Sequence, residues 1–416
     1  MRIAIVGTGV SGLVVAHNVH HAHDVTLFEA DDRIGGHVHT WDISIDGGSY
    51  AIDSGFIVYN ERNYPNFSRL LTELGVATQP STMSFSVRAD QDGLEYNGTT
   101  LNQLFVQRRN ALRPSFLRML ADVLRFNREA TLRVAAAHEP LGTFLERGGY
   151  SRAFREWYLL PMGSAIRSMP LSDVLGMPAS FFVRFFENHG MLSVNNRPQW
   201  RVVCGGSARY VEALIAPFHH RIRVNEPVRR IIRLADRVEI NGESFDQVVL
   251  ACHSDQALAL LADPTDAERA ILGAMPYLAN DAVLHTDVSL LPRARRAWAA
   301  WNYRIGSDPI APAALTYNMS MLQSIDATET FCVTLNGTDQ IDPARIIGRV
   351  GYLHPWFTVA GAAAQARHDE ISGINRTHYC GAYWGNGFHE DGVVSGMAVA
   401  REIEIAAAAA LAGAGA

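Results

Sequence analysis

A glycine-rich turn near the start of the chain constrains the fold more than any other feature. The apolar run from Arg2 to Val6 has the composition of a strand buried on both faces. Gly7-Thr8-Gly9-Val10-Ser11-Gly12 follows directly, and a helix is expected from Leu13 to about His20. A second strand, Asp24 to Phe28, ends at Glu29. This order of strand, turn, helix, strand and acid predicts a Rossmann-like parallel sheet that binds a dinucleotide.

The glycines of this turn have separate physical roles. Gly7 allows the sharp turn, Gly9 lets the backbone approach a pyrophosphate, and Gly12 lets helix and strand pack closely. The helix N-terminus offers unpaired N–H groups and a partial positive charge to the phosphates. Glu29 lies where a carboxylate accepts hydrogen bonds from both ribose hydroxyls. A flexible turn without a ligand is the plain alternative, but the matching strand, helix and acid favour a dinucleotide.

The residues that follow Glu29 point to a longer nucleotide. Arg33 and the pair Gly35-Gly36 form a Glu-x-x-x-Arg-x-Gly-Gly pattern, and Asp391-Gly392 opens a helix near the other end of the chain. Both motifs resemble the flavin-containing amine oxidase and phytoene desaturase superfamily, which binds FAD. Where that family usually has a further arginine, this chain has His37.

The resemblance implies a set of contacts with FAD. The start of the C-terminal helix would receive the pyrimidine and ribityl oxygens, the segment around Gly55 would lie under the isoalloxazine, and Val228 would bind adenine through its backbone. The expected cofactor-binding residues are Gly7, Gly9, Val10, Ser11, Gly12, Glu29, Ala30, Arg33, Gly35, Gly36, His37, Gly55, Phe56, Val228, Asp391, Gly392 and Val393.

The expected fold class is α/β, with two discontinuous domains. Residues 1–65, 198–265 and 366–416 are expected to form a Rossmann-like FAD-binding domain with a parallel sheet and a β-meander. Residues 66–197 and 266–365 are expected to form an α+β substrate domain of mixed sheet and cap helices. There Tyr303, Tyr317 and Met319 are expected to face inward from strands, and plain sheet core is the simpler interpretation of each.

Composition and charge exclude several classes of protein. The 416 residues suffice for two or three domains, and 48% hydrophobic against 19% charged residues is typical of globular proteins. A net charge of −6 gives no reason to expect a nucleic-acid partner. The four cysteines form no CxxC pair, which fits a reducing compartment. The nucleotide-binding strand starts at the second residue, so no cleaved signal is expected, and no apolar run predicts a membrane span. A cytoplasmic location is expected.

The segment from 101 to 190 is expected to be mainly helical, and part of it is basic. Seven arginines between residues 108 and 133 are opposed only by Asp122 and Glu129. A basic amphipathic helix can lie on an anionic membrane surface, whereas the solvated face of a cap helix is the more common alternative. Peripheral contact with the inner face of a membrane is therefore a hypothesis at this point.

Four further segments resemble a bacterial subgroup of predicted NAD/FAD-binding proteins that are linked with cyclopropane-type fatty-acid synthases. They are Asp53 to Asn60, Ser84 to Ser86, Trp200 to Val202 and Tyr383 to Gly392. The resemblance implies a small, hydrophobic, fatty-acyl substrate and hydride transfer to flavin N5, in C–C desaturation or double-bond isomerisation. A flavin amine or amino-acid oxidase and a non-catalytic FAD-binding accessory protein are the alternatives.

Two departures from the superfamily argue against amine oxidation. The chain contains no lysine, so all 36 of its Lys-plus-Arg residues are arginine, whereas amine oxidases of this fold place a lysine near flavin N5. Those enzymes also hold the amine between two aromatic residues. The second of these positions is His389 in this chain.

Desaturation of a C–C bond needs a base for the proton next to the departing hydride. His389 and His39 are the candidate bases, because imidazole titrates near physiological pH, and Tyr317 is a third candidate catalytic residue. His37 is expected to hydrogen-bond FAD instead. Its i, i+2 spacing with His39 resembles a metal-binding pair, but no third ligand is evident nearby, so no metal site is predicted.

Overall fold

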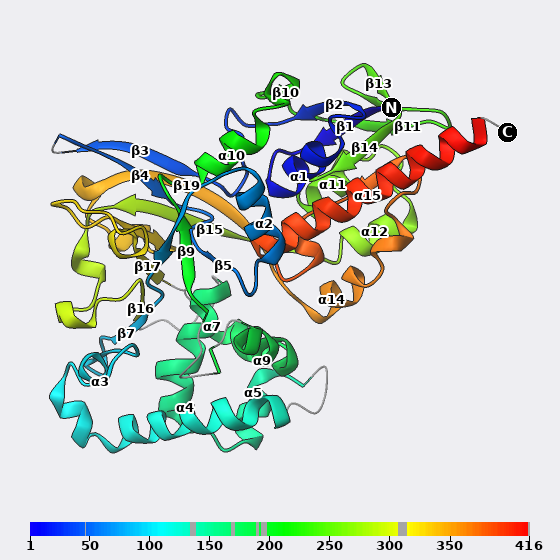
Figure 1. Ribbon diagram of the computed structural model, residues 1–416. Helices are drawn as coiled ribbons and strands as arrows, with labels where there is room; N and C mark the ends of the chain where they lie inside the picture. The colour runs from blue at the N-terminus through cyan, green and yellow to red at the C-terminus, as the bar shows by residue number, and fades with distance from the viewer. Residues whose placement is uncertain are drawn as a thin grey trace.

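A five-stranded parallel sheet organises one half of the molecule and lies beside both chain termini (Figure 1). The computed structural model describes residues 1–45, 47–133, 139–167, 171–188, 191–192, 198–306 and 314–414. The strand order is β10-β2-β1-β14-β20, with every neighbouring pair parallel. The strands are β1 (Arg2–Val6), β2 (Asp24–Phe28), β10 (Ile222–Arg223), β14 (Gln247–Leu250) and β20 (Thr377–Tyr379). Their carboxyl ends share one edge, where ligands of such sheets bind.

Helices and a small meander cover this sheet. Helix α1 (Val10–Val19) packs against the long C-terminal helix α15 (His389–Ala414), and the two run side by side in Figure 1. Their contact buries Leu13, Val14 and Val399. The other helices of this half are α2 (Pro65–Glu73), α10 (Ala208–Ile215), α11 (Ser254–Leu260), α12 (Asp266–Leu272) and α14 (Val359–Gln365). The antiparallel meander consists of β11 (Ile231–Arg233), β12 (Val238–Ile240) and β13 (Glu243–Phe245).

A seven-stranded mixed sheet forms the second layer, in the order β19-β15-β18-β17-β16-β7-β8. Only the β16–β7 pair is parallel. The strands are β7 (Phe85–Ala89), β8 (Leu94–Asn97), β15 (Tyr277–His285), β16 (Trp301–Ile305), β17 (Ala314–Asn318), β18 (Cys332–Leu335) and β19 (Ile346–Pro355). Smaller sheets pair β3 (Thr40–Ile45) with β4 (Gly48–Asp53), and β9 (Trp200–Val203) with both β5 (Tyr59–Asn60) and β6 (Thr78–Ser81).

A group of helices packs below the mixed sheet around an aromatic core (Figure 1). The core contains Phe116, Phe126, Phe144, Phe154 and Phe186, all buried. The helices are α3 (Leu101–Leu104), α4 (Pro114–Arg133), α5 (Leu141–Arg147), α6 (Arg152–Phe154), α7 (Leu160–Arg167), α8 (Leu171–Gly176) and α9 (Ala179–Asn188), and α13 (Met319–Leu322) lies beside the mixed sheet. None of the described helices combines the length and apolar composition that a membrane-spanning segment requires.

The structure confirms the expected fold class, a mixed α/β protein with a parallel sheet and a large mixed sheet. It differs from the sequence prediction in three elements. Helix α1 begins at Val10 rather than Leu13, directly after the turn. Met319 is buried, but it starts helix α13 rather than lying within the strand expected from Ala314 to Met321. Strand β19 was not predicted, and it proves important for the site. The expected domain boundaries stay a prediction.

Candidate cofactor and substrate site

One cavity joins the two sheets. It has a volume of about 1390 Å³ and extends from the carboxyl ends of β1 and β2 to strands β16, β17 and β19. Typical ligand pockets hold about 300–1000 Å³, so this cavity has room for a dinucleotide and a second molecule. Its lining includes Gly7 and Glu29 at one end and Trp301 and Tyr317 at the other.

The backbone of the glycine turn makes the close contacts that a dinucleotide-binding turn requires. A Cβ on Gly12 would lie 2.2 Å from the carbonyl oxygen of Gly7, so only glycine allows this contact. Gly7 itself has φ +104°, a conformation that disfavours other residues. A Cβ on Gly9 would meet nothing within 4 Å, so the backbone there is open to a ligand. Gly7 and Gly9 line the cavity, whereas Gly12 acts behind it in the packing of α1.

The two charged residues of the motif organise this end of the cavity. Glu29 accepts a hydrogen bond from the backbone N–H of Thr8 at 3.0 Å and another from the Thr8 hydroxyl. Arg33 donates to the carbonyl oxygens of Gly36 at 2.9 Å and Val38 at 2.5 Å, which fixes the loop after β2. The predicted residues at this end that line the cavity are Gly7, Gly9, Val10, Ser11, Glu29, Ala30, Arg33, Gly35, Gly36 and Val228.

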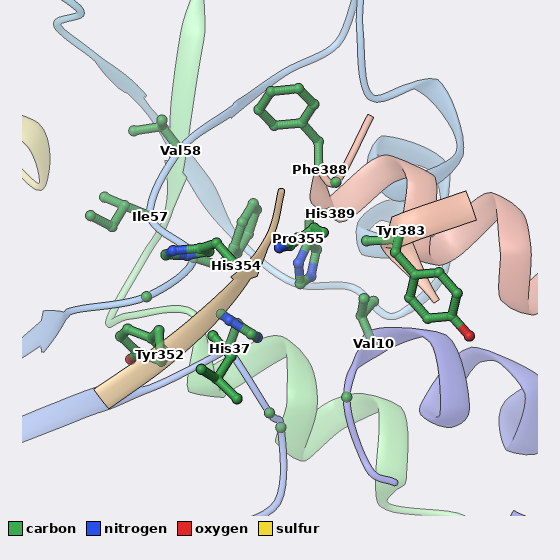
Figure 2. A pocket seen from close by; sticks show the side chains of 18 of the residues that line it. Val10, His37, Ile57, Val58, Tyr352, His354, Pro355, Tyr383, Phe388 and His389 are labelled. Atoms are coloured by element: carbon green, nitrogen blue, oxygen red, sulfur yellow. The ribbon is translucent and has the colours of Figure 1, made fainter. Parts of the chain in front are cut away.

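Three imidazoles meet in the middle of the cavity lining. Figure 2 shows His37, from the loop after β2, close to Tyr352 and His354 of β19. The rings of His37 and Tyr352 stack with centroids 5.0 Å apart, and His253 lies 6.0 Å from His37. Burial and the neighbouring imidazole of His354 lower the pKa of His37 to about 3, and burial lowers that of His354 to about 4. These rings are therefore neutral at physiological pH.

Hydrogen bonds fix one of these rings and leave another open. The side-chain amide of Asn280 donates to Nδ1 of His354 at 2.9 Å, and Asn336 in turn donates to the oxygen of Asn280 at 2.7 Å. Among the described residues, nothing hydrogen-bonds Nε2 of His37, although this atom is buried. A buried polar atom without a partner at a cavity wall is available to hydrogen-bond a molecule in the cavity.

His389 lines the cavity from the start of α15. Its ring stacks on Phe56, with centroids 3.8 Å apart and planes 14° apart, and its Nε2 lies 2.5 Å from the hydroxyl oxygen of Tyr210. Burial raises the pKa of Tyr210, so this hydroxyl keeps its proton and shares a hydrogen bond with Nε2. Burial lowers the pKa of His389 to about 3. The imidazole is thus neutral at physiological pH.

The other two predicted catalytic residues differ in position. Tyr317 lines the cavity, in edge-to-face contact with Trp301 at 5.3 Å. His39 does not line it, because its ring stacks on Trp41 at 4.4 Å. Burial and the nearby Arg33 lower the pKa of His39 to about 4. The structure therefore brings His389 and Tyr317 to one cavity and leaves His39 outside its lining.

The C-terminal motif supports the cavity without lining it. The carboxylate of Asp391 accepts a hydrogen bond from the backbone N–H of Phe388 at 2.8 Å. A Cβ on Gly392 would lie 2.6 Å from Val10, so this glycine lets α15 approach the turn. Asp391, Gly392 and the buried Val393 are absent from the cavity lining, whereas Gly55 and Phe56 are part of it.

The far part of the cavity is apolar. Met83, Phe85, Met162, Trp301 and Tyr317 contribute to it. Among the described lining residues, charged side chains occur only at the nucleotide end, as Glu29, Asp31 and Arg33. Sequence reasoning missed several lining residues, namely His253, Tyr277, Tyr352 and His354. Among the described residues, no group of three or more His, Cys, Asp or Glu side chains is arranged to hold a metal ion.

These features fit FAD. The open backbone at Gly9, the N-terminus of α1 and Glu29 suit a diphosphate and a ribose, and the buried Nε2 of His37 lacks a partner further along the cavity. FAD is the cofactor of this protein.

Comparison with solved structures shows the same fold over nearly the whole chain. Cyclohexylamine oxidase from Brevibacterium oxydans matches with a TM-score of 0.69 and 16% identity, covering 97% of this chain and 99% of that one. A putative protoporphyrinogen oxidase from Exiguobacterium sp. gives a TM-score of 0.70 and 18% identity, with 97% and 98% covered. A fatty acid isomerase from P. acnes that produces CLA gives a TM-score of 0.68 and 17% identity, with 96% and 98% covered.

Comparison with protein sequences identifies the family. Tryptophan 2-monooxygenase of Agrobacterium tumefaciens is 54% identical over 37 residues, which is 8% of this chain and only 5% of that enzyme. Residues 10–293 match the family described as flavin containing amine oxidoreductase. The chain therefore belongs to the flavin-containing amine oxidoreductase family.

Proposed function

We propose that this FAD-dependent oxidoreductase acts on a hydrophobic, fatty-acyl substrate, by desaturation of a C–C bond or isomerisation of a double bond. The observation that carries the proposal is the far part of the cavity, where the described lining has no charged side chain. An amine substrate is a cation near neutral pH, and burying it beside Trp301 and Tyr317 without a carboxylate would cost several kcal/mol. An acyl chain has no such cost there.

The resemblance to proteins linked with cyclopropane-type fatty-acid synthases supports the same substrate class, and so does the fold shared with a fatty acid isomerase. Bound FAD supplies a hydride acceptor at N5. The chain itself contributes the far part of the cavity, here called the apolar chamber, which excludes water. It also contributes the neutral His389, which stacks on Phe56 and hydrogen-bonds Tyr210. Tyr317 contacts the acyl chain in this proposal.

An amine oxidase is the second candidate, because the family and several proteins of the same fold oxidise amines by name. Anaerobic mixing separates the candidates. The purified flavoprotein is mixed with unsaturated fatty acids, with phospholipids that carry them, or with cyclohexylamine and putrescine, and flavin absorbance is followed. Bleaching by the acyl compounds, or their isomerisation detected by mass spectrometry, supports the proposal. Bleaching by the amines alone would overturn it, and no change with either class would indicate an accessory protein.

A charge placed in the apolar chamber tests the same proposal on the residue level. Met83 lines the chamber and is half-buried, so Met83→Glu adds a carboxylate of similar length. We expect the KM for an acyl substrate to rise on the order of tenfold, because the buried charge must be desolvated. Met83→Gln is the matched control, with the same shape and no charge. Equal KM values for the two variants would contradict an acyl chain at Met83.

A further inference from the structure

Five leucines of the helical group are exposed, namely Leu101, Leu112, Leu117, Leu124 and Leu132. Three of them, Leu117, Leu124 and Leu132, belong to α4 and form what is here called the leucine surface. Leu101, Leu112 and Leu132 are 76%, 87% and 85% exposed, more than any other large apolar side chain in the described part of the chain. The next is Ile405, at 61%. Large exposed apolar patches mark interaction surfaces in soluble proteins.

The leucines are not part of the helix's core-facing stripe. Phe116, Met119 and Phe126 of α4 are buried in the aromatic core, so this helix already covers its inner face. Leu117 and Leu124 are seven residues apart and therefore share the opposite, outer face. Figure 1 shows α4 along the lower edge of the molecule, with α3 at one end of it. The helix thus presents a second apolar stripe to the outside.

The segment that carries this stripe has an excess of positive charge. Residues 101–133 contain seven arginines and only two acids, a net charge of +5, whereas the rest of the chain has 29 arginines and 40 acids. Arg128 is exposed on the leucine side of α4. Arg118 and Arg125 pair with Asp122 at 3.5 Å and 3.0 Å, so one buried carboxylate faces two guanidinium groups. An apolar stripe among arginines is complementary to an anionic lipid surface, where leucines enter the acyl boundary and arginines meet phosphates.

We propose that the leucine surface docks this protein on an anionic phospholipid bilayer. A second copy of the chain is a poorer occupant, because two segments with an excess of arginine over acid would repel each other. The cavity supports the lipid assignment: its lining includes the exposed Gly98 and Thr99, which lie just before α3, and α3 lies at one end of α4 in Figure 1. Docking therefore brings one end of the cavity lining close to the bilayer. The docking does not depend on an acyl substrate.

Vesicle flotation tests the proposal with the full-length flavoprotein. Vesicles of phosphatidylcholine mixed with phosphatidylglycerol should carry the protein with them, and vesicles of phosphatidylcholine alone should carry much less. The triple variant Leu117→Ser, Leu124→Ser, Leu132→Ser should reduce the partition coefficient on the order of tenfold, because three apolar side chains no longer enter the bilayer. These side chains lie on the surface, so the variant should keep its flavin and its unfolding temperature.

The matched control is Ile405→Ser, which removes an exposed apolar side chain from α15, outside the leucine surface. It should bind vesicles as the unchanged protein does. Equal binding to both vesicle types, or unchanged binding of the triple variant, would overturn the proposal. Loss of a dimer in the triple variant on size-exclusion chromatography, without vesicle binding by the unchanged protein, would assign the surface to self-association instead.

Discussion

His389 illustrates how a single residue can keep its place in the site and change its expected role. The sequence suggested a base, since imidazole ordinarily titrates near neutrality. In the structure burial lowers the pKa of His389 to about 3, and the hydroxyl of Tyr210 hydrogen-bonds Nε2. A ring with so low a pKa is a weak base, and one of its nitrogens is already engaged, so it is better suited to hydrogen bonding than to proton abstraction. His39 could not have been excluded from sequence, because the stacking partner Trp41 becomes decisive only once the chain folds.

Removing the hydroxyl of Tyr210 tests this arrangement. Tyr210→Phe leaves Nε2 of His389 buried without its hydrogen-bond partner, so we expect a loss of about 1–3 kcal/mol in the free energy of unfolding. The loss of this partner should also change the ionisation of His389 and with it the pH profile of kcat. Denaturant unfolding and pH-dependent turnover are the measurements. Tyr50→Phe, at a half-buried tyrosine outside the cavity lining, is the control and should change neither. An unchanged stability and pH profile in Tyr210→Phe would contradict the bond.

At the scale of elements, two glycines let the last helix reach the first turn. A Cβ on Gly396 would lie 2.5 Å from the carbonyl oxygen of Ser11 and 3.1 Å from Val14, so α15 and α1 touch backbone to backbone. A Cβ on Gly392 would meet the side chain of Val10 at 2.6 Å, so this glycine also lets α15 approach the turn. The C-terminal motif thus positions the turn that is expected to hold the diphosphate.

Gly396→Ala should separate these helices. The added methyl group forces α15 away from α1, which we expect to cost about 1–3 kcal/mol in the free energy of unfolding. Because the N-terminus of α1 shifts as well, flavin content after purification should fall. Gly176→Ala, where a Cβ meets nothing within 4 Å, is the control. Full flavin content and normal stability in Gly396→Ala would show that the contact does not position the turn.

Motifs made the nucleotide end predictable, because Gly7, Gly9, Gly12 and Glu29 lie within one strand–helix–strand unit whose geometry is local. No local sequence motif predicted strand β19. Its ten residues include Gly348 and Gly351, and residues opposite them on β15 are far away in sequence. Tyr352 and His354 reach the cavity only through this long-range pairing, so the sequence alone does not place them there.

At the scale of the whole molecule, several buried titratable groups determine how stability depends on pH. Burial lowers the pKa of His37 and His389 to about 3 and that of His285 and His354 to about 4, from an ordinary value of 6.5. Between the lowered pKa values and 6.5, the unfolded chain binds more protons than the folded one, so the free energy of unfolding rises with pH. Burial raises the pKa of Asp53 instead, so its effect makes stability fall as the pH rises.

We therefore expect the unfolding temperature of the flavoprotein to rise by at least about 5 °C from pH 5 to pH 7.5. The histidine contributions are complete above pH 6.5 and are lost as the pH falls toward 3 or 4. Burial raises the pKa of Asp53 from 3.8 to about 6, so its contribution is lost as the pH rises through 6, but four histidines outweigh one carboxyl group. Scanning fluorimetry measures how the unfolding temperature changes with pH.

His285→Gln should make the unfolding temperature depend less on pH, since His285 is buried and accepts a hydrogen bond from the backbone N–H of Asp287 at 3.0 Å. The exposed His219→Gln should leave it unchanged. An unfolding temperature that is flat or falls across this range would mean that the buried imidazoles are not held neutral by the fold.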